Sequence, residues 1–228
     1  IEEGAELLVV NGDVVSSMDL AALLHAHRSN GAWMTLAVTL RPDLSDTIHK
    51  VVFDDSGAVL EVDGVHAATS DSIETHRGIY TGTVVLSPET LQLLPEGREA
   101  CLKEEGFWPA LRQGRNLRVW RTQSFWEDIG TPQSYLAAQF RALNTPELIP
   151  PGYTRIGPHQ YVHPLAQIGE DVSLDGPCLI GPGAKVDAGA HVNGPIVMGR
   201  NSRIATCEQV GGVVLWEGAC VRVGVPRN

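Results

Sequence analysis

Two hydrophobic patterns follow one another along the chain and change near residue 145. Before that point, short apolar runs alternate with segments of helical spacing; after it, an aliphatic residue recurs at every sixth position. Strands that alternate with helices predict a layered, doubly wound α/β sheet. A short fixed repeat predicts a solenoid, because each repeat buries its apolar side chain only against its neighbours. We therefore predict two domains, 1–145 and 154–228, joined by a linker at 146–153 that is rich in proline.

Apolar runs and capping residues predict the elements of the first domain. Residues 6–10 form a short apolar run, which is typical of a strand buried on both faces of a parallel sheet. The pattern Ser16-x-x-Asp19 predicts the start of a helix that ends at Asn30-Gly31. Further strands are predicted at 33–40, 51–53, 59–60, 79–86 and 117–121, with a hairpin turn at 54–57, and further helices after Ser87-Pro88, around 107–111 and after Thr131-Pro132.

The second domain is defined by its repeat of six residues. Ten successive repeat positions are aliphatic: Ile156, Val162, Ile168, Leu174, Ile180, Val186, Val192, Met198, Ile204 and Val210. Each hexad is expected to form a short strand and a turn with the aliphatic side chain pointing inward, and three hexads to complete a triangular coil. The pattern resembles the left-handed parallel β-helix of hexapeptide-repeat proteins. The predicted fold is thus part of a doubly wound α/β sheet followed by a left-handed parallel β-helix.

Composition and charge narrow the classes of function. The chain has 228 residues, of which 43% are hydrophobic and 19% charged, so it can form packed cores. Its net charge of −10 argues against a nucleic acid or an anionic membrane surface as partner. No apolar run is long enough to span a membrane. The four cysteines show no Cys-x-x-Cys spacing; we expect them to be small buried hydrophobic residues in a protein of the reducing cytoplasm.

Two aspartates stand out because each follows a predicted strand. Asp13 comes directly after the run at 6–10 and the turn Asn11-Gly12, and Asp128 lies shortly before the helix at Pro132. In open α/β sheets, ligands bind at the carboxyl ends of the strands. Mg²⁺ is commonly held by one or two carboxylates together with substrate phosphates. The pair therefore predicts a Mg²⁺ site, whereas either aspartate alone would be typical of a turn or a helix cap.

Three segments, in this order, resemble the sugar-1-phosphate nucleotidyltransferases. They are Val10-Asn11-Gly12-Asp13, Tyr80-Thr81-Gly82 before an apolar strand and Ser87-Pro88-Glu89, and Trp126-x-Asp128-Ile129-Gly130-Thr131-Pro132-x-x-Tyr135. The last segment is the most specific of the three. The mannose-1-phosphate guanylyltransferases of this family often carry a C-terminal hexapeptide β-helix, so the resemblance covers both predicted domains.

The resemblance implies a reaction and a set of site residues. An oxygen of a sugar 1-phosphate attacks the α-phosphorus of a nucleoside triphosphate, here GTP, and pyrophosphate leaves; GDP-mannose is the expected product. Asp13 and Asp128 are similar to the two catalytic Mg²⁺ ligands of the family. Gly12 would contact substrate, and Thr81 with Gly82 would line the sugar pocket, where a residue without a side chain lets the backbone approach the hydroxyls. Positioning of the two anions would supply most of the catalysis.

Parts of the family pattern are absent from this sequence. The Gly-x-Gly-Thr-Arg-Leu loop and the Pro-Lys-Pro lysine, which belong upstream of the first strand, do not occur, and the chain opens on Ile1-Glu2. We therefore expect a chain truncated by about a hundred residues and inactive alone. Residues 60–64 stand near the place of the family's Glu-Lys-Pro turn, and Tyr80 stands where many members have a sugar-binding asparagine. The base and the sugar are left open by these differences.

Two other functions remain open at this point. The chain could belong to a regulatory subunit that binds nucleotide sugars without turnover. Hexapeptide β-helices also serve acyltransferases, in which a histidine acts as general base between subunits; the histidines in the repeat region are His159, His163 and His191. Of these, His191 falls at an expected turn and is expected to be solvated. The β-helix is expected to assemble the protein into a homo-oligomer, because its flat faces and open end favour stacking.

Overall fold

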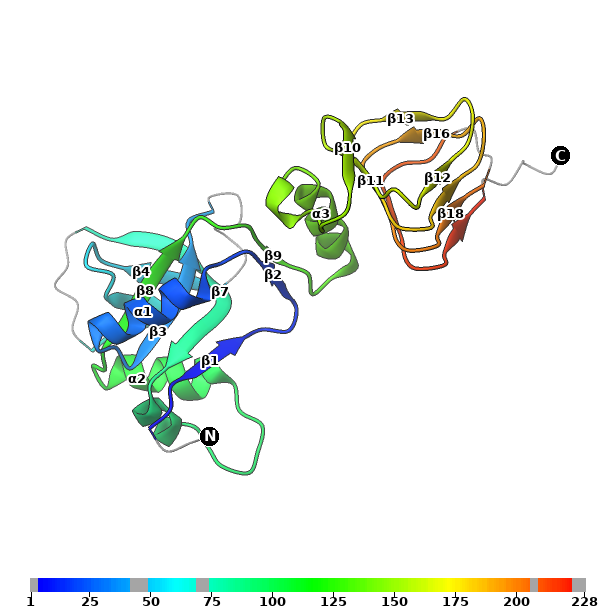
Figure 1. The fold of residues 1–228 in the computed structure, drawn as a ribbon. Helices are drawn as coiled ribbons and strands as arrows, with labels where there is room; N and C mark the ends of the chain where they lie inside the picture. Colours follow the sequence, from blue (N-terminus) through cyan, green and yellow to red (C-terminus); the bar gives the residue numbers. More distant parts are fainter. Residues whose placement is uncertain (1–3, 42–48, 69–73, 206–208, 223–228) are drawn as a thin grey trace. The chain divides into compact units, whose positions relative to one another are not determined.

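The chain divides into two compact units, Ile1–Asp128 and Ile129–Asn228. The computed structural model describes residues 4–41, 49–68, 74–205 and 209–222 (Figure 1). The boundary between the units lies before the helix that begins at Pro132, whereas the sequence pattern places that helix in the first domain. The helix joins the second unit because it packs on strands of the repeat.

A mixed sheet forms the body of the first unit. Its elements are, in chain order, β1 (Leu7–Val10), β2 (Val14–Ser16), α1 (Leu20–Asn30), β3 (Met34–Thr39), β4 (Lys50–Phe53), β5 (Val59–Val62), β6 (Val65–His66), β7 (His76–Leu86), the 3₁₀ helix η2 (Pro88–Leu93), the π-helix η3 (Leu102–Phe107), α2 (Trp108–Arg112), β8 (Leu117–Thr122) and β9 (Trp126–Asp128). The strand order is β6-β5-β4-β7-β3-β8, and β1 also pairs with β7. Only the β3–β8 pair of this sheet is parallel among the described strands.

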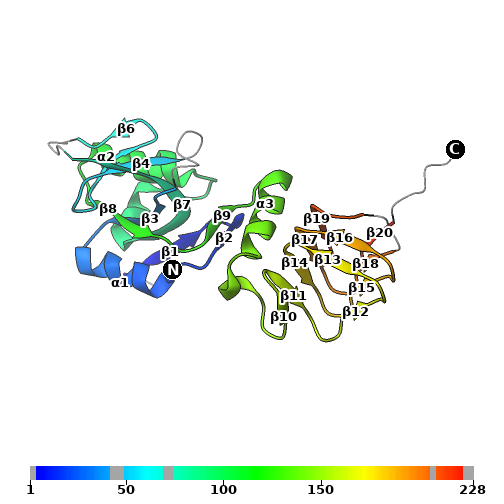
Figure 2. The same ribbon diagram turned by 90° about the horizontal axis from the view of Figure 1, so that it is seen from above.

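Helical elements cover both faces of this sheet at β3, whose six residues are all buried. On one face Leu36 belongs to a core that includes Phe107 and Leu111 from η3 and α2. On the other face Ala37 packs with Leu23 of α1. Figure 2 shows α1 and α2 on opposite sides of the sheet. This arrangement confirms the layered α/β sheet that the alternation of strands and helices predicts.

Two local predictions in this unit are wrong. Strand β1 is antiparallel to β7 and only half buried, with Leu8 and Val10 39% and 47% exposed, so it is not a parallel strand buried on both faces. Among the described residues β1 pairs with one strand only, and one of its two faces is covered. Its side chains therefore alternate between partly buried and exposed. The N-cap of α1 is Asp19, whose side chain accepts from the backbone N–H of Ala22; Ser16 instead accepts from Met18. The predicted stop is confirmed, since Gly31 caps α1 in the left-handed region.

The second unit is a parallel β-helix with one helix packed against it. Its elements are α3 (Pro132–Ala142), the 3₁₀ helix η4 (Pro146–Leu148), β10 (Thr154–Gly157), β11 (Gln160–Val162), β12 (Gln167–Ile168), β13 (Ser173–Asp175), β14 (Cys178–Ile180), β15 (Lys185–Val186), β16 (His191–Asn193), β17 (Ile196–Met198), β18 (Arg203–Ile204), β19 (Val213–Leu215) and β20 (Cys220–Val221). Parallel strands stack with the same face inward, for example Val162 on Ile180 on Met198. Each coil thus contains three hexads, which confirms the predicted solenoid; its left-handed winding stays a prediction.

The inward column differs from the prediction at its first positions and near its last coil. Ile156 and Ile168 are 54% and 40% exposed. Ile156 lies in β10, which pairs antiparallel with β11 and is therefore not part of a coil. Met198 stacks on Leu215, which is 17 residues later instead of 18, so the repeat loses one residue in this coil. The remaining column from Ile180 to Val210 is buried, as predicted.

Helix α3 packs on the outer face of one β-helix sheet. It contacts β17 and β19, and Figure 2 shows it beside this sheet. Tyr161 and Val197 lie at the outward positions of β11 and β17 and are nevertheless only 6% and 8% exposed. The Trp216 indole N–H donates to the Tyr135 hydroxyl at 3.1 Å, and the two rings meet edge to face. The helix therefore completes the fold of the β-helix unit.

The cysteines follow their prediction only in part. Cys178 points into the β-helix core, and its burial raises the pKa of the thiol to about 11. Cys101 and Cys220 are exposed, so the prediction that they are buried is wrong; both are free thiols. Cys207 lies outside the described residues. None of the described helices is long and apolar enough to cross a membrane.

Candidate functional site

The candidate site begins where two strands share one edge of β7. β1 pairs with Thr83–Leu86 and β4 pairs with His76–Ile79, so Tyr80, Thr81 and Gly82 lie between them. The backbone N–H of Asn11 donates to the Gly82 carbonyl at 2.9 Å, and that of Tyr80 donates to the His49 carbonyl at 3.0 Å. The two strands therefore separate at this point, and the segment that follows β1 lies next to the opening.

Gly82 fits this position for a steric reason. Its φ of +76° lies in the left-handed region, and a Cβ there would come within 2.8–2.9 Å of the Asn11 side chain. Any side chain at position 82 would displace Asn11 from the edge of the opening. Gly12, by contrast, has open space where a Cβ would lie. The structure thus accounts for Gly82 through its contact with Asn11.

A short antiparallel ribbon brings the two predicted aspartates to one place. β2 pairs with β9 in the register Val14 to Asp128, so Asp13 directly precedes the residue opposite Asp128. The two aspartates are 115 residues apart in the sequence. Asp13 is exposed and Asp128 partly buried. The ribbon therefore brings Asp13, two residues after Asn11 at the opening between β1 and β4, close to Asp128 in the fold.

Trp126 and Thr81 anchor this ribbon to the sheet. The indole N–H of Trp126 donates to the Thr81 carbonyl at 2.8 Å, and both residues are buried. The Thr81 hydroxyl donates to the Ala37 carbonyl of β3 at 3.0 Å. The buried Thr81 therefore links the ribbon to the sheet, because its carbonyl accepts from Trp126 and its hydroxyl donates to β3. The tryptophan of the Trp-x-Asp segment thus fixes the position of Asp128.

An ion pair that the sequence does not reveal adds a second anchor. Arg41, two residues after the end of β3, donates to the Glu127 carboxylate at 2.9 Å and to the Trp126 carbonyl at 3.3 Å. Both side chains are largely buried, at 23% and 11% exposure. Arg41 and Glu127 are 86 residues apart, and no local pattern marks them as partners. The pair ties β9 to the carboxyl end of β3.

A small apolar cavity of about 250 Å³ lies at the opening between the strands. It is lined by Val9, Asn11, His49, Tyr80, Cys101, Leu102, Lys103 and Phe107. The rings of Tyr80 and Phe107 meet edge to face, with centroids 5.3 Å apart. Burial raises the pKa of Tyr80 well above its ordinary value of 10, so the phenol is neutral near pH 7. The cavity thus has an aromatic wall and a polar rim.

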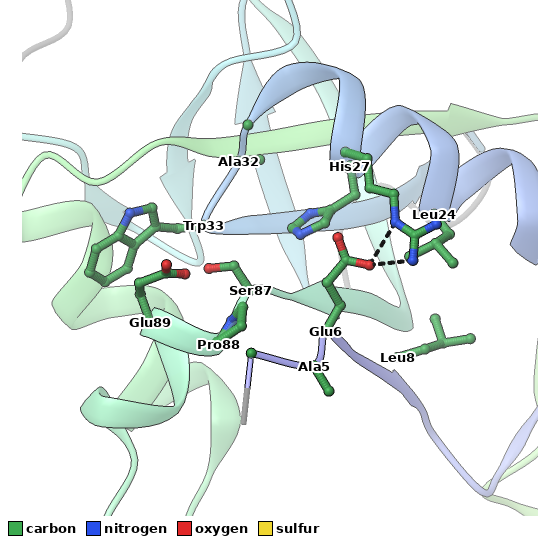
Figure 3. Close-up of a pocket in the computed structure, with 13 residues that line it drawn as sticks. Ala5, Glu6, Leu8, Leu24, His27, Ala32, Trp33, Ser87, Pro88 and Glu89 are labelled. Carbon is green, nitrogen blue, oxygen red and sulfur yellow. Dashed lines mark hydrogen bonds and ion pairs between the residues drawn. The ribbon is translucent and has the colours of Figure 1, made fainter. Parts of the chain in front are cut away.

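A larger cavity of about 970 Å³ lies at the other end of β1. Figure 3 shows His27 and Glu6 turned towards each other in it, with Trp33 and Glu89 further along. Glu6 is paired with Arg28 at 2.8 Å, and the His27 ring shares a hydrogen bond of 2.8 Å with the Thr35 hydroxyl. None of the predicted site residues Gly12, Asp13, Thr81, Gly82 and Asp128 lines this cavity or the smaller one. The smaller cavity is the nearer along the chain to Asp13, because Asn11 lines it.

Two histidines of the β-helix, His163 and His191, make local contacts. His191 lies in β16, where a strand replaces the expected turn; it is exposed as expected, and its Nδ1 lies 2.8 Å from the Ser173 hydroxyl. His163 Nδ1 accepts from the backbone N–H of Leu165 at 3.2 Å, and the His163 ring packs against Tyr153. These contacts occupy one nitrogen of each ring within the coil structure.

Comparisons with known proteins agree on one kind of chemistry. The family model described as nucleotidyl transferase matches residues 1–145. A mannose-1-phosphate guanylyltransferase of Mycobacterium tuberculosis is 27% identical over 95% of this chain and 54% of its own length. A UTP–glucose-1-phosphate uridylyltransferase of Synechocystis is also 27% identical, over 92% of this chain and 54% of its own. The chain therefore spans about half the length of these curated relatives.

A plant protein and a solved structure are similar to this chain as well. Mannose-1-phosphate guanylyltransferase 1 of Arabidopsis thaliana is 26% identical over 96% of this chain and 56% of its own length. Among solved structures, HddC from Yersinia pseudotuberculosis is 19% identical and covers 60% of this chain and 55% of its own, with a TM-score of 0.45.

Proposed function

The chain belongs to the nucleotidyl transferase family, and we propose that it forms part of a site that joins a nucleotidyl group to a sugar 1-phosphate. In this reaction a phosphate oxygen of the sugar 1-phosphate forms a bond to the α-phosphorus of a nucleoside triphosphate. The bond from the α-phosphorus to the bridging oxygen breaks, and pyrophosphate takes the electron pair. The products are a nucleotide sugar and pyrophosphate.

We propose guanylyl transfer to mannose 1-phosphate as the specific activity, with GTP as the nucleotide. Several of the matched relatives are named mannose-1-phosphate guanylyltransferases, which supports this choice. The Synechocystis relative is named for uridylyl transfer to glucose 1-phosphate at the same identity, so UTP with glucose 1-phosphate is the pair to compare.

The β2–β9 ribbon is the observation that carries the proposal. In its register Asp13 directly precedes the residue opposite Asp128, although 115 residues separate the two aspartates. Asn11, two residues before Asp13, lines a cavity of a size suited to part of a sugar. Two carboxylates from neighbouring strands fit the donor set of Mg²⁺, which takes its remaining ligands from substrate phosphates and water. Among the described residues no three or more His, Cys, Asp and Glu side chains gather as a metal site of their own. When bound there, Mg²⁺ would neutralise phosphate charge.

The remaining residues hold the substrates in place. Asn11 lines the cavity and is in close contact with Gly82, and Gly12 leaves space for a phosphate beside Asp13. Trp126 and Arg41 keep β9 fixed, so that Asp128 does not need to be ordered when substrate binds. Catalysis of this type depends on positioning two anions, and the protein supplies no covalent intermediate.

The two aspartates provide the test of the proposed function. Asp13→Asn and Asp128→Asn, introduced into the protein at its full encoded length, are each expected to lower pyrophosphate release by at least about 100-fold, because each removes one charged ligand of Mg²⁺. Asp175→Asn, an exposed aspartate of β13, is the matched control and should keep activity. Turnover is measured with GTP or UTP and with mannose or glucose 1-phosphate.

Three outcomes separate the alternatives. Near-normal activity of both aspartate variants would exclude the metal assignment. Binding of a nucleotide sugar without any turnover by the parent protein would favour a regulatory subunit. Release of free coenzyme A from an acyl thioester, lost in His191→Ala, would favour acyl transfer instead.

We also propose that the β-helix assembles the protein as a homo-oligomer in the cytoplasm. Leu165 and Trp216 in the coils are 66% and 69% exposed, more than the other exposed large apolar side chains of the described residues. The thiols of Cys101, Cys178 and Cys220 are free, as is typical of a reducing compartment.

A further inference from the structure

A three-residue polar cluster lies at the rim of the small cavity. The ammonium group of Lys103 donates to Asp63 Oδ2 at 2.9 Å and lies 3.4 Å from His49 Nδ1. The same His49 nitrogen is 3.4 Å from Asp63 Oδ2. Lys103 and His49 line the cavity, and Asp63 contacts both of them. Lys103 lies in the π-helix η3, His49 directly before β4, and Asp63 in the turn between β5 and β6.

Asp63 is held in an unusual conformation to make these contacts. Its φ of +48° lies in the left-handed region, which a residue other than glycine seldom adopts. Its other carboxylate oxygen accepts from the backbone N–H of Lys50 at 2.7 Å. Burial alone would raise the pKa of Asp63, but the hydrogen bonds from Lys103 and Lys50 hold it below its ordinary value of 3.8. The carboxylate is therefore charged and fixed in orientation.

The π-helix and a neighbouring tryptophan ring hold Lys103 in place. It is the second residue of a π-helix, an uncommon element that often occurs at functional sites. Its ammonium group lies 5.7 Å from the centre of the Trp108 ring, whose indole N–H donates to the Val62 carbonyl at 3.2 Å. The side chains of Lys103 and Asp63 are still 27% and 22% exposed, so a ligand can reach them.

The cavity combines this cluster with an apolar wall. Tyr80 and Phe107 present aromatic rings, and Leu102 and Val9 add aliphatic surface. A sugar ring has the same two-sided character, because its C–H groups are apolar and its hydroxyls both donate and accept hydrogen bonds. One hydroxyl can accept from Lys103 while its neighbour donates to Asp63, which is an arrangement that suits two adjacent hydroxyls.

The charges of the cluster favour a neutral group over a phosphate. The positive charge of Lys103 is already matched by Asp63 at 2.9 Å, so a phosphate dianion at this rim would face a carboxylate. Hydroxyl groups carry no charge and use donors and acceptors equally. A purely structural ion pair would need neither the cavity beside it nor the exposure that both side chains retain.

We propose that Lys103, Asp63 and His49 recognise adjacent hydroxyl groups of the sugar and thereby select which sugar 1-phosphate the site accepts. The proposal rests on the proposed function, since it assigns a sugar to this cavity. Within it, Lys103 contacts the substrate, whereas Asp63 both contacts a hydroxyl and positions Lys103.

The experiment compares sugar phosphates that lack single hydroxyls. Mannose 1-phosphate and its 2-, 3-, 4- and 6-deoxy analogues are titrated against the full-length protein without nucleoside triphosphate, with the fluorescence of the tryptophans, Trp108 among them, and calorimetry as readouts. At least one deoxy analogue is expected to bind 10-fold or more weakly. In Lys103→Met the parent sugar phosphate should bind at least 10-fold more weakly, and the penalty for that analogue should largely vanish.

Matched variants separate recognition from folding. Lys103→Arg keeps the charge and should bind the parent sugar phosphate more tightly than Lys103→Met does. Asp63→Asn should weaken binding of the parent sugar phosphate and reduce the penalty for the same deoxy analogue. Lys185→Met, an exposed lysine of β15, removes one positive charge elsewhere and should leave binding unchanged. Melting temperatures of all variants are recorded, and Lys103→Arg carries the test if Lys103→Met does not fold.

The outcomes distinguish this inference from the proposed function. Unchanged affinity in Lys103→Met, or a deoxy penalty that persists in it, overturns the inference even when the protein makes a nucleotide sugar. Competition by inorganic phosphate that depends on Lys103 also overturns it, because the cluster would then bind the phosphate. Binding that depends on Lys103 in a protein that never releases pyrophosphate supports the inference and contradicts the transfer reaction.

Discussion

At the scale of single residues, the contact between Gly82 and Asn11 determines the shape of the candidate site. Gly82→Ala places a Cβ 2.8–2.9 Å from the Asn11 side chain at a φ of +76°. We expect a loss of about 2–3 kcal/mol in the free energy of unfolding, since strain at positive φ and overpacking both contribute. Urea denaturation measures this loss. Gly12→Ala is the control and should change stability by less than about 0.5 kcal/mol, because a Cβ there meets open space.

A second residue, His27, makes stability depend on pH. It is 2% exposed, and burial, together with the charge of Arg28, lowers its pKa below the ordinary 6.5 although Glu6 opposes the shift. The unfolded chain therefore binds this proton at a higher pH than the folded chain does. The contribution of neutral His27 to stability is fully present above about pH 6.5 and decreases as the pH falls through the folded-state pKa.

The variant that checks this prediction is His27→Gln, which can still bond Thr35 but does not titrate. Urea midpoints measured between pH 5 and 8 should decrease less steeply below pH 6.5 in this variant than in the parent protein. His25→Gln, an exposed histidine of the same helix α1, should follow the parent curve. Parallel curves for the parent and His27→Gln would contradict the assignment.

At the scale of elements, local sequence patterns predicted which strands and helices exist better than they predicted which strands pair with each other. The run at β1 predicts a strand, but four apolar residues do not reveal whether the neighbour is parallel or antiparallel. The hairpin of β4 and β5 was predictable because its Asp and Gly turn residues lie between the strands. The inward positions of the hexad repeat were predictable over most of its length, because each coil packs between similar coils. The prediction is wrong at Ile156, which lies in β10 and not in a coil.

The candidate site shows the same limit. Asp13 and Asp128 could be named because each lies in a short segment with a recognisable composition, and the register of β2 and β9 brings them together. Arg41 with Glu127 and Lys103 with Asp63 could not be named, since 86 and 40 residues separate the partners. Their meeting depends on sheet order, which no local pattern encodes.

At the scale of the whole molecule, exposed aromatic surface on the β-helix predicts self-association. Trp216 is 69% exposed in the last described coil, and its hydrogen bond to Tyr135 fixes the ring on the surface. A fixed, exposed tryptophan is a frequent centre of protein interfaces, and its removal typically costs about 2 kcal/mol or more of binding free energy. We therefore expect Trp216→Ser to weaken association at least about 10-fold, as measured by sedimentation velocity over a range of concentrations.

Leu165 supplies the control for this prediction. It is 66% exposed in the first coil, so Leu165→Ser removes a similarly exposed apolar side chain from the opposite end of the β-helix unit. If the last coil carries the contact, Leu165→Ser should sediment like the parent protein and Trp216→Ser should not. A parent protein that stays monomeric at all concentrations, or equal effects of the two substitutions, would show that Trp216 does not mark the interface. Association retained in Trp216→Ser but lost in Leu165→Ser would place the contact at the first coil.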